Sequence, residues 1–326
     1  MSNLSPSPTT TPCEVYVGID VCKAHLDVHV MPKGVSFRVT NDTTGHRSLK
    51  RKIEAYAPKL PKLIVMEATS RYHRAAARYL QTQGLAVAVV NPFRAHQFAA
   101  LQGRLAKTDR MDAEGLALFG AAGHAVPKAL PSVTVQRLQD LATARLSLSK
   151  QIVATSNNRK AQTDALICRQ QATQVRLLER QEKELLETMR GIVTADANLK
   201  ARVAILTSVP GVGELTALLL VAGMPELGSC SGPEAASLLG VAPFTRESGP
   251  CRHKASIRGG RRLVRRGVYM AALSAAQYNH DLKAFYDRLV AKGKAKKCAL
   301  VAVMRKLILL LNTLLKENRP WQKLHV

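Results

Sequence analysis

Hydrophobic positions in the first part of the chain form short runs rich in Val, Ile and Leu, which predict β-strands. We expect five of them. Helical patterns separate the last three runs, so the element order is three strands, then helix, strand, helix, strand and helix. This order predicts an α/β domain over residues 14–130, with a mixed sheet and helices packed on it. The expected strands are Val15–Asp20, Leu26–Met31, Val35–Thr40, Leu63–Met66 and Ala86–Val90.

The pattern changes to helical spacing after Pro131. No Pro or Gly occurs between Pro131 and Gly191, and leucines recur among Gln, Arg, Lys and Glu. This composition predicts a helical region over residues 131–200, made of two helices with a bend at the polar stretch Thr155–Lys160. Both an intramolecular helical hairpin and an intermolecular coiled coil fit the apolar spacing.

A mainly helical second domain is expected over residues 201–326. Its opening phrase, Ser208-Val-Pro-Gly-Val-Gly-Glu214, leads directly into the apolar run Leu215–Ala222. This is the pattern of a helix-hairpin-helix, in which Gly211 and Gly213 allow a tight turn whose backbone N–H groups hold a phosphate. A plain helix–helix turn is the alternative.

Charge narrows the class of partner. Lys and Arg outnumber Asp and Glu by 48 to 23, for a formal net charge of +25, which favours a polyanion such as DNA or RNA. No membrane span is predicted, because the apolar stretches are short or interrupted by Arg305 and Lys306. Residues 1–13 are rich in Ser, Thr and Pro and predict a disordered tail, not a signal peptide, so a cytoplasmic protein is expected.

Four acidic residues stand out against this basic background. Asp20 and Glu67 end apolar strands that we expect to be neighbours, and Asp109 and Asp112 lie three residues apart at the start of a predicted helix. Spacing of i, i+3 puts both aspartates on one helical face, where they complete a set of hard oxygen ligands for Mg²⁺ or Mn²⁺. Helix-dipole and capping roles are the alternative for each residue taken alone. Asp27 falls within a strand and is not assigned to the metal.

A second group of candidates lies far downstream, in Phe244-Thr-Arg-Glu-Ser-Gly-Pro250 and the basic run after it. Ser248 is flanked by cations in a predicted turn, where its hydroxyl can meet a phosphodiester if a base or metal activates it. An ordinary turn serine is the alternative. Six isolated cysteines without a Cys-x-x-Cys pair fit neither zinc nor disulfides. The residues expected to bind nucleic-acid phosphates are Arg246, Arg252, Lys254, Arg258, Arg261, Arg262, Arg265 and Arg266.

Five ordered phrases resemble the DEDD transposases of bacterial insertion sequences, the insertion-sequence one-ten family of bridge-RNA-guided recombinases. The resemblance runs from about Val15 to Leu315. The phrases are Val17-Gly-Ile-Asp-Val-Cys-Lys23, Val65-Met-Glu-Ala-Thr69, Lys107-Thr-Asp-Arg-Met-Asp-Ala113, Ser208-Val-Pro-Gly-Val-Gly213 and Glu247-Ser-Gly249.

The resemblance implies an N-terminal ribonuclease-H-like (RuvC-like) domain whose acidic quartet, Asp20, Glu67, Asp109 and Asp112, binds Mg²⁺. It also implies that Ser248 is a nucleophile that forms a covalent phosphoserine link to DNA. The implied partners are double-stranded donor and target DNA, a structured bridge RNA that selects both by base pairing, and further copies of the chain, from dimer to tetramer. A bacterial, nucleoid-associated location follows.

Two other functions remain open from the residues alone. A RuvC-like hydrolytic nuclease of the junction-resolvase type needs only the quartet, and would leave free 3′-hydroxyl and 5′-phosphate ends with no protein attached. A non-enzymatic nucleic-acid-binding protein would tolerate Asp20→Ala and Asp109→Ala in every DNA assay. The sequence does not specify the guide RNA or the target sites.

Overall fold

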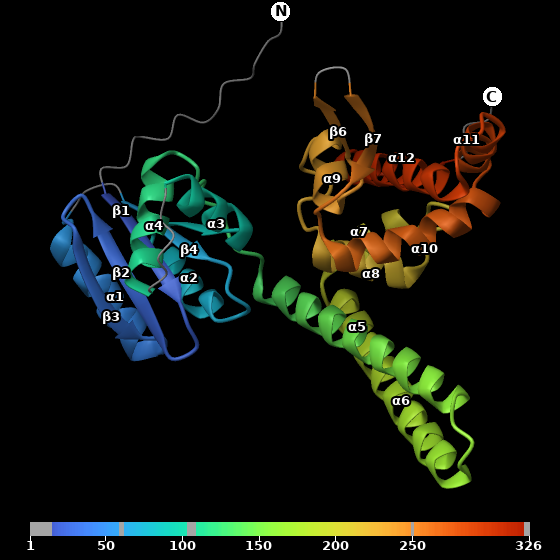
Figure 1. Ribbon diagram of the computed structural model, residues 1–326, viewed down its shortest axis with the longest axis horizontal. Coiled ribbons are helices and arrows are strands. Elements are labelled where there is room, and N and C mark those ends of the chain that lie inside the picture. Colours follow the sequence, from blue (N-terminus) through green and yellow to red (C-terminus); the bar gives the residue numbers. More distant parts are fainter. Residues whose placement is uncertain (1–14, 59–61, 103–108, 249–250, 323–326) are drawn as a thin grey trace, which may run out of the picture. The chain divides into compact units, whose positions relative to one another are not determined.

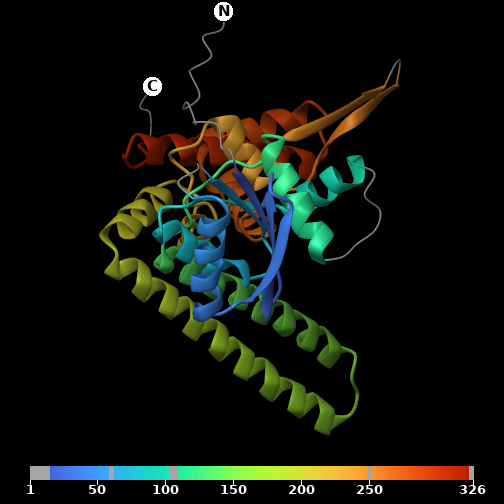
Figure 2. The same ribbon diagram turned by 90° about the vertical axis from the view of Figure 1, so that its left-hand side faces the viewer.

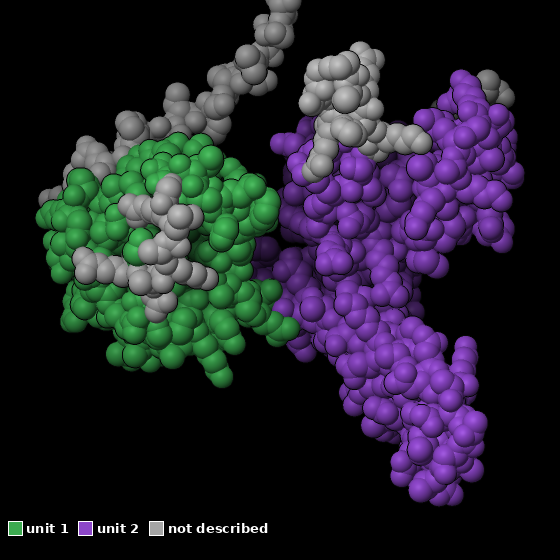
Figure 3. Space-filling model, viewed as in Figure 1, with its two compact units in different colours: residues 1–130 green, residues 131–326 purple. Residues whose placement is uncertain are grey.

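The chain folds into two compact units, residues 1–130 and residues 131–326 (Figure 3). The structure, a computed structural model, describes residues 15–58, 62–102, 109–248 and 251–322. Of residues 109–110, 245–248 and 251–255 it describes the backbone alone.

Unit 1 is built on a five-stranded mixed sheet with the order β3-β2-β1-β4-β5. β2 runs antiparallel to β1 and β3, whereas β4 runs parallel to β1 and β5. The element order and the mixed sheet confirm the ribonuclease-H-like prediction, and the strand bounds differ from the expected ones by at most one residue. The strands are β1 (Val15–Val21), β2 (His25–Met31), β3 (Val35–Thr40), β4 (Lys62–Glu67) and β5 (Ala86–Val90).

Helices cover both faces of this sheet (Figure 1). One core joins alternate strand residues such as Val17, Ile19 and Ile64 to helices α1 (Thr43–Tyr56) and α2 (His73–Thr82). The other face packs against α4 (Asp109–Ala121) and α3 (Pro92–Leu101). The sheet is therefore buried on both sides, which explains the nearly continuous apolar runs of β1 and β4.

Unit 2 begins with two long antiparallel helices, α5 (Val133–Lys160) and α6 (Ala165–Ala195), which confirm an intramolecular hairpin (Figure 2). The predicted bend at 155–160 is wrong, because α5 continues through these residues and the chain turns at 161–164. Asp164 accepts hydrogen bonds from the N–H groups of Leu166 and Ile167, so this aspartate fixes where the second helix starts.

The rest of unit 2 is mainly helical, as expected. Its core also includes Leu138, Ala142 and Met189 of the long helices, so the base of the α5–α6 hairpin belongs to the same packed unit. A two-stranded hairpin, β6 (Pro243–Ser248) and β7 (Cys251–Ile257), interrupts the helices. The helices are α7 (Ala197–Thr207), α8 (Glu214–Gly223), α9 (Gly232–Leu239), α10 (Arg262–Tyr278), α11 (His280–Ala291) and α12 (Lys296–Lys316).

Helix α12 is long and apolar enough to cross a membrane by length and composition alone, with a mean hydropathy of 1.9. Arg305 and Lys306 do not interrupt it, contrary to the sequence-based expectation. Half of the most apolar stretch of α12 is buried within unit 2, where Val303, Leu307 and Leu311 are fully enclosed. Its apolar character is therefore explained by core packing.

Candidate functional site

Asp20 and Glu67 lie at neighbouring strand ends in unit 1. Strands β1 and β4 are parallel, with Ile19 opposite Met66, and each acidic residue follows one position later. Because side chains alternate between the two faces of a sheet, Asp20 shares its face with Gly18, and Glu67 shares the same face with Val65. Both carboxylates therefore belong to the face that α4 covers, at the carboxyl edge of the sheet.

Gly18 brings α4 unusually close to that face. A Cβ atom at Gly18 would lie 1.9 Å from the carbonyl oxygen of Ala113 and 2.4 Å from the backbone nitrogen of Ala117, so only glycine fits. Further along the helix, a Cβ at Gly120 would meet the side chains of Val65 and Tyr16. Helix α4 therefore runs antiparallel to β1, and its first turn lies toward the strand ends.

This direction brings the predicted aspartates to the acidic edge. Asp112 precedes Ala113, the residue packed on Gly18, and Asp109 begins the helix one turn earlier. The backbone thus brings the positions of all four predicted acids to one edge of unit 1. The side chain of Asp109 lies outside the described residues, and Asp112 is half-buried.

A polar bridge ties together the segments that follow Asp20 and Glu67. The Asn41 side-chain amide donates to the carbonyl oxygen of Cys22 at 2.9 Å and to that of Tyr72 at 3.1 Å. The Asn41 Oδ1 lies 2.9 Å from the ring Nε2 of His46, which is 5% exposed. Burial lowers the pKa of His46, which favours the neutral ring that supports Asn41.

Asp27 faces Asp20 across β1 and β2 but has its own partners. Its carboxylate accepts two hydrogen bonds from Arg38, at 2.8 and 3.0 Å, and lies 3.3 Å from His25 Nε2. Two directly opposed carboxylates would repel, so the Arg38 guanidinium offsets the charge of Asp27. This pairing agrees with leaving Asp27 out of the predicted metal set.

The edge offers hard oxygen donors of the type that Mg²⁺ and Mn²⁺ prefer. Among the described side chains, no group of three or more Asp, Glu, His or Cys residues is close enough to hold a metal ion. The donor chemistry thus fits a divalent cation, whereas the full ligand set would need Asp109, whose side chain the description does not include. Asp20 already accepts a hydrogen bond from the N–H of Val21 at 2.9 Å.

Ser248, the second candidate, ends strand β6 in unit 2. Its backbone pairs with Cys251 on β7, and Gly249 and Pro250 lie outside the described residues. The hairpin projects from the helices of its unit in both ribbon views (Figures 1 and 2). Ser248 therefore lies at the far end of the hairpin from its helical base.

The base of the hairpin is a tight crossing of two glycine-containing segments. A Cβ on Gly260 would lie 2.3 Å from the backbone nitrogen of Gly240, and both residues have positive φ, +70° and +78°. Arg265 donates to the carbonyl oxygens of Gly259 at 2.7 Å and Gly240 at 3.2 Å, which joins the two segments. The orientation of the hairpin is therefore fixed by glycines and one arginine.

The predicted phosphate-binding arginines divide into two kinds. Arg261 donates to both carboxylate oxygens of Glu226 at 2.6 Å and to the carbonyl of Gly223, so it is committed to the fold, as is Arg265. Arg262 and Arg266 are exposed on the first turns of α10, and exposed Arg258 lies 4.9 Å from the ring centre of Phe244. Arg246, Arg252 and Lys254 have side chains outside the description.

The predicted helix-hairpin-helix turn connects α7 to α8. Gly211 has φ +99°, and a Cβ there would lie 2.5 Å from the backbone of Ala275 in α10. Packing therefore requires a glycine at this position. Gly213 is exposed at the start of α8 with open space around it. Next to it, Glu214 pairs with Arg190, which places an acid beside the expected phosphate position.

Sequence reasoning missed the residues that hold these sites in place. Asn41 and His46 carry only a weak signal, since Asn41-Asp42 before a helix is read as a cap, which Asp42 indeed provides by accepting from Gly45. Gly18 within an apolar strand is a stronger sign of close backbone approach. Gly240 and the pair Gly259–Gly260 gave the same kind of signal around the hairpin.

Comparison with known proteins identifies the family. Residues 17–166 match a family model of IS110-type DEDD proteins described as a transposase, and residues 203–287 match one described as the transposase IS116/IS110/IS902 family. The pilin gene-inverting proteins of Moraxella lacunata and Moraxella bovis are 30% and 29% identical to the chain. Each alignment covers 95% of this chain and 98% of the relative.

A solved structure of RuvC from Thermus thermophilus aligns with 35% of this chain and 99% of its own, at 17% identity and a TM-score of 0.27. The family is shown by the two family matches and by the near full-length relatives. The chain belongs to the IS110 family of DEDD transposases, enzymes that cleave and join DNA strands.

Proposed function

We propose that the chain is an RNA-guided DNA recombinase that cleaves and rejoins strands through a phosphoserine intermediate at Ser248. The observation that carries the metal-site part is the close contact of Gly18 with α4, which brings the positions of Asp20, Glu67, Asp109 and Asp112 to one sheet edge. The position of Ser248 at the end of β6, away from the helical base of the hairpin, supports Ser248 as the nucleophile, because a strand-end serine there can reach an extended polyanion.

In the proposed reaction, the Ser248 oxygen attacks a DNA phosphorus atom. A serine–phosphate bond forms as the bond from phosphorus to one deoxyribose oxygen breaks, and the departing oxygen gains a proton while the serine hydroxyl loses one. The reverse attack by a hydroxyl of the new partner strand releases serine and restores the phosphodiester, without ATP. A divalent cation held by the quartet would offset charge on the phosphate during these steps.

A denaturing-gel assay tests the nucleophile. The protein, purified with RNA transcribed from its flanking DNA, is mixed with labelled element-end DNA and Mg²⁺. The parent should give a slow-migrating, protease-sensitive adduct that Ser248→Ala lacks, while the matched control Ser256→Ala, an exposed serine of the same hairpin, should retain it. Equal nicking by parent and Ser248→Ala, with free ends, would instead favour the hydrolytic nuclease.

A comparison of variants at Asp20 and Asp27, which are neighbours on β1 and β2, tests the acidic quartet. Asp20→Asn should abolish metal-dependent cleavage, whereas Asp27→Asn, directly across the sheet, should retain it because Asp27 pairs with Arg38. Both variants keep the side-chain shape. Equal activity of Asp20→Asn and the parent would remove Asp20 from the metal site.

Guide RNA and self-association complete the proposal. Exposed Arg262 and Arg266 and the net charge of +25 support binding to RNA and DNA phosphates.

Exposed apolar side chains on the α5–α6 hairpin, Val153 at 52%, Leu166 at 52% and Leu177 at 43%, support contact with a second copy. Leu177→Asp should therefore reduce the molar mass measured by light scattering, while Glu179→Asp on the same helix should not.

The relatives leave open which rearrangement this chain performs. The two Moraxella proteins are named for inverting a pilin gene, so we include inversion of a DNA segment beside transposition in the proposal. A plasmid carrying two element ends in inverted orientation would distinguish these outcomes, because inversion reverses the intervening DNA whereas transposition moves it.

A further inference from the structure

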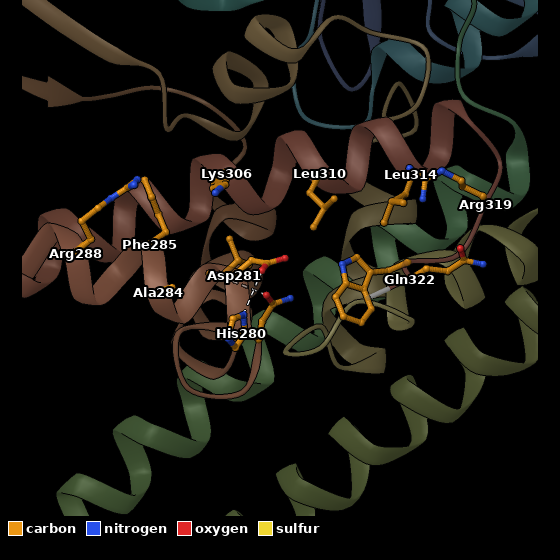
Figure 4. A pocket seen from close by; sticks show the side chains of 13 residues that line it. His280, Asp281, Ala284, Phe285, Arg288, Lys306, Leu310, Leu314, Arg319 and Gln322 are labelled. Carbon is orange, nitrogen blue, oxygen red and sulfur yellow. Dashed lines mark hydrogen bonds and ion pairs between the residues drawn. The ribbon is translucent and has the colours of Figure 1, made fainter. Parts of the chain in front are cut away.

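Unit 2 contains a pocket far along the chain from Ser248. Its cavity volume is about 720 Å³, within the range of ligand-binding sites, and it lies between α11, α12 and the segment after α12 (Figure 4). None of the predicted site residues lines it. The pocket is therefore a separate feature that the proposed chemistry does not explain.

Apolar and aromatic side chains form much of the wall. Phe285, Leu310 and Trp321 line the pocket, and the backbone N–H of Trp321 donates to Ser208 Oγ at 2.8 Å, which anchors the final segment to the end of α7. Aromatic faces of this kind bind unstacked nucleobases without regard to sequence.

Cations stand at two ends of this wall. Figure 4 shows Arg288 and Lys306 at one end and Arg319 at the other. Arg288 and Lys306 lie 5.5 and 4.8 Å from the ring centre of Phe285, and neither is paired with a carboxylate among the described residues. Two acids partly offset this positive charge, because Glu317 pairs with Arg319 and Asp281 lies 3.4 Å from His280. The net charge of the residues around the pocket remains positive.

A buried amide completes the pocket lining. Asn279 is 1% exposed, and its Oδ1 accepts from the N–H of Leu282 at 3.2 Å, but its Nδ2 has no hydrogen-bond partner among the described residues. An unpaired buried donor is costly, so a ligand that supplies an acceptor recovers free energy. Nucleobase edges carry such acceptors.

We propose that this pocket takes one unstacked nucleotide of a single-stranded nucleic acid, with the base against Phe285, Leu310 and Trp321. Its phosphate lies at Arg288 and Lys306, and the base edge approaches Asn279. An apolar ligand would not explain the cations, and a simple polyanion would not use the aromatic wall. The inference deepens the proposed function, on which it rests for the presence of unpaired nucleic acid.

Trp321 is the single tryptophan of the 326 residues, so intrinsic fluorescence reports directly on this pocket. The full chain is titrated in EDTA with penta-uridylate, with penta-thymidylate and, as a polyanion without bases, with inorganic polyphosphate. Either oligonucleotide should quench Trp321, and the tighter one identifies the RNA or DNA source, while polyphosphate should not quench. Equal quenching by polyphosphate, or none by both oligonucleotides, would overturn the proposal.

Variants assign the quenching to the pocket. Phe285→Leu should weaken oligonucleotide binding about tenfold through lost stacking. Lys306→Gln should weaken it about fivefold and reduce the salt dependence by about one phosphate contact. Lys297→Gln, an exposed lysine on the first turn of the same helix, is the matched control and should bind as the parent does.

Unchanged binding by Lys306→Gln, a surface change that leaves the fold intact, would place the nucleotide elsewhere. The assay contains no metal and measures no cleavage, so Ser248→Ala should quench as the parent does. Failure of the pocket proposal is therefore distinguishable from failure of the phosphoserine chemistry.

Discussion

The acidic edge of unit 1 and the Ser248 hairpin of unit 2 are held in place by opposite means. Asp20 and Glu67 come from interior strands of a sheet covered on both faces, and Asp109 and Asp112 come from α4, which packs on Gly18. Ser248 ends a two-stranded hairpin, which by itself would be marginally stable in water. Its orientation depends on the crossing at Gly240 and Gly260 below it. The acidic edge is thus held in place by core packing, whereas the position of Ser248 depends on the glycine crossing at the base of its hairpin.

Disrupting the packing of α4 on Gly18 should cause the greatest loss of stability. Gly18→Ala forces a Cβ into the backbone of α4 and should destabilise unit 1 by about 3 kcal/mol. Gly115→Ala, on the same helix with open space around it, is the matched control and should stabilise by up to about 1 kcal/mol. Thermal unfolding measures the stability of both variants, and hydrogen exchange in β1 and α4 of the native protein locates the change. Similar stabilities of the two variants would contradict the close packing.

The second test breaks the anchor of the hairpin. Gly260→Ala meets the backbone of Gly240 and should loosen the hairpin by about 2–3 kcal/mol. Gly259→Ala shares the φ of +70° but has open space, so it should cost only about 1 kcal/mol. Faster amide exchange in β6 and β7, with unit 1 unchanged, is the expected readout. Equal exchange rates in the two variants would mean that the crossing does not hold the hairpin.

A third test separates two neighbouring arginines. Arg265→Gln removes the hydrogen bonds to Gly240 and Gly259 and should cost about 1–2 kcal/mol of local stability. Arg266→Gln should leave the hairpin exchange rates unchanged and weaken nucleic-acid binding with a smaller salt dependence, because Arg266 is exposed. The converse pattern would reverse the assignment of structural and binding arginines.

A fourth test concerns the bridge formed by Asn41 and His46 next to the acidic edge. The pKa of His46 is lowered by burial from an ordinary 6.5, so unfolding takes up a proton when the pH falls. The stabilising contribution is fully present above about pH 6.5 and is lost as the pH falls through the folded value. The melting temperature of unit 1 should therefore drop on acidification, and His46→Gln should flatten that drop.

Asn41→Ala provides the complementary measurement. It removes the bonds to Cys22 and Tyr72 and should cost about 2 kcal/mol at neutral pH. Cleavage should fall more than stability predicts, because the segments after Asp20 and Glu67 lose their common tie. A loss of activity fully explained by unfolding would show that Asn41 is merely structural.

Strand positions and family could be predicted because local patterns and ordered motifs carry them. Apolar runs bounded by polar turns gave the five strands within one residue, and the motif around Asp20 pointed to the family that the comparisons show. The turn between the long helices was predicted wrongly, because the polar composition of Thr155–Lys160 is typical of a bend. In the structure these residues continue α5, and the second helix starts only after Asp164, which caps it.

The order of helices and strands along the chain could be predicted from the sequence, since it depends on short-range pattern. The basic character and the residues whose chemistry suits phosphodiester cleavage could also be predicted, because they follow from composition and motifs. The folded structure was needed to show that Gly18 lets α4 pack over the acidic edge. It also showed that Arg261 and Arg265 bind within the fold while Arg262 and Arg266 remain exposed. It alone gathered Asn279, Phe285, Lys306 and Trp321 into one pocket. Such contacts join residues distant in the chain, and their geometry depends on packing that no local pattern encodes.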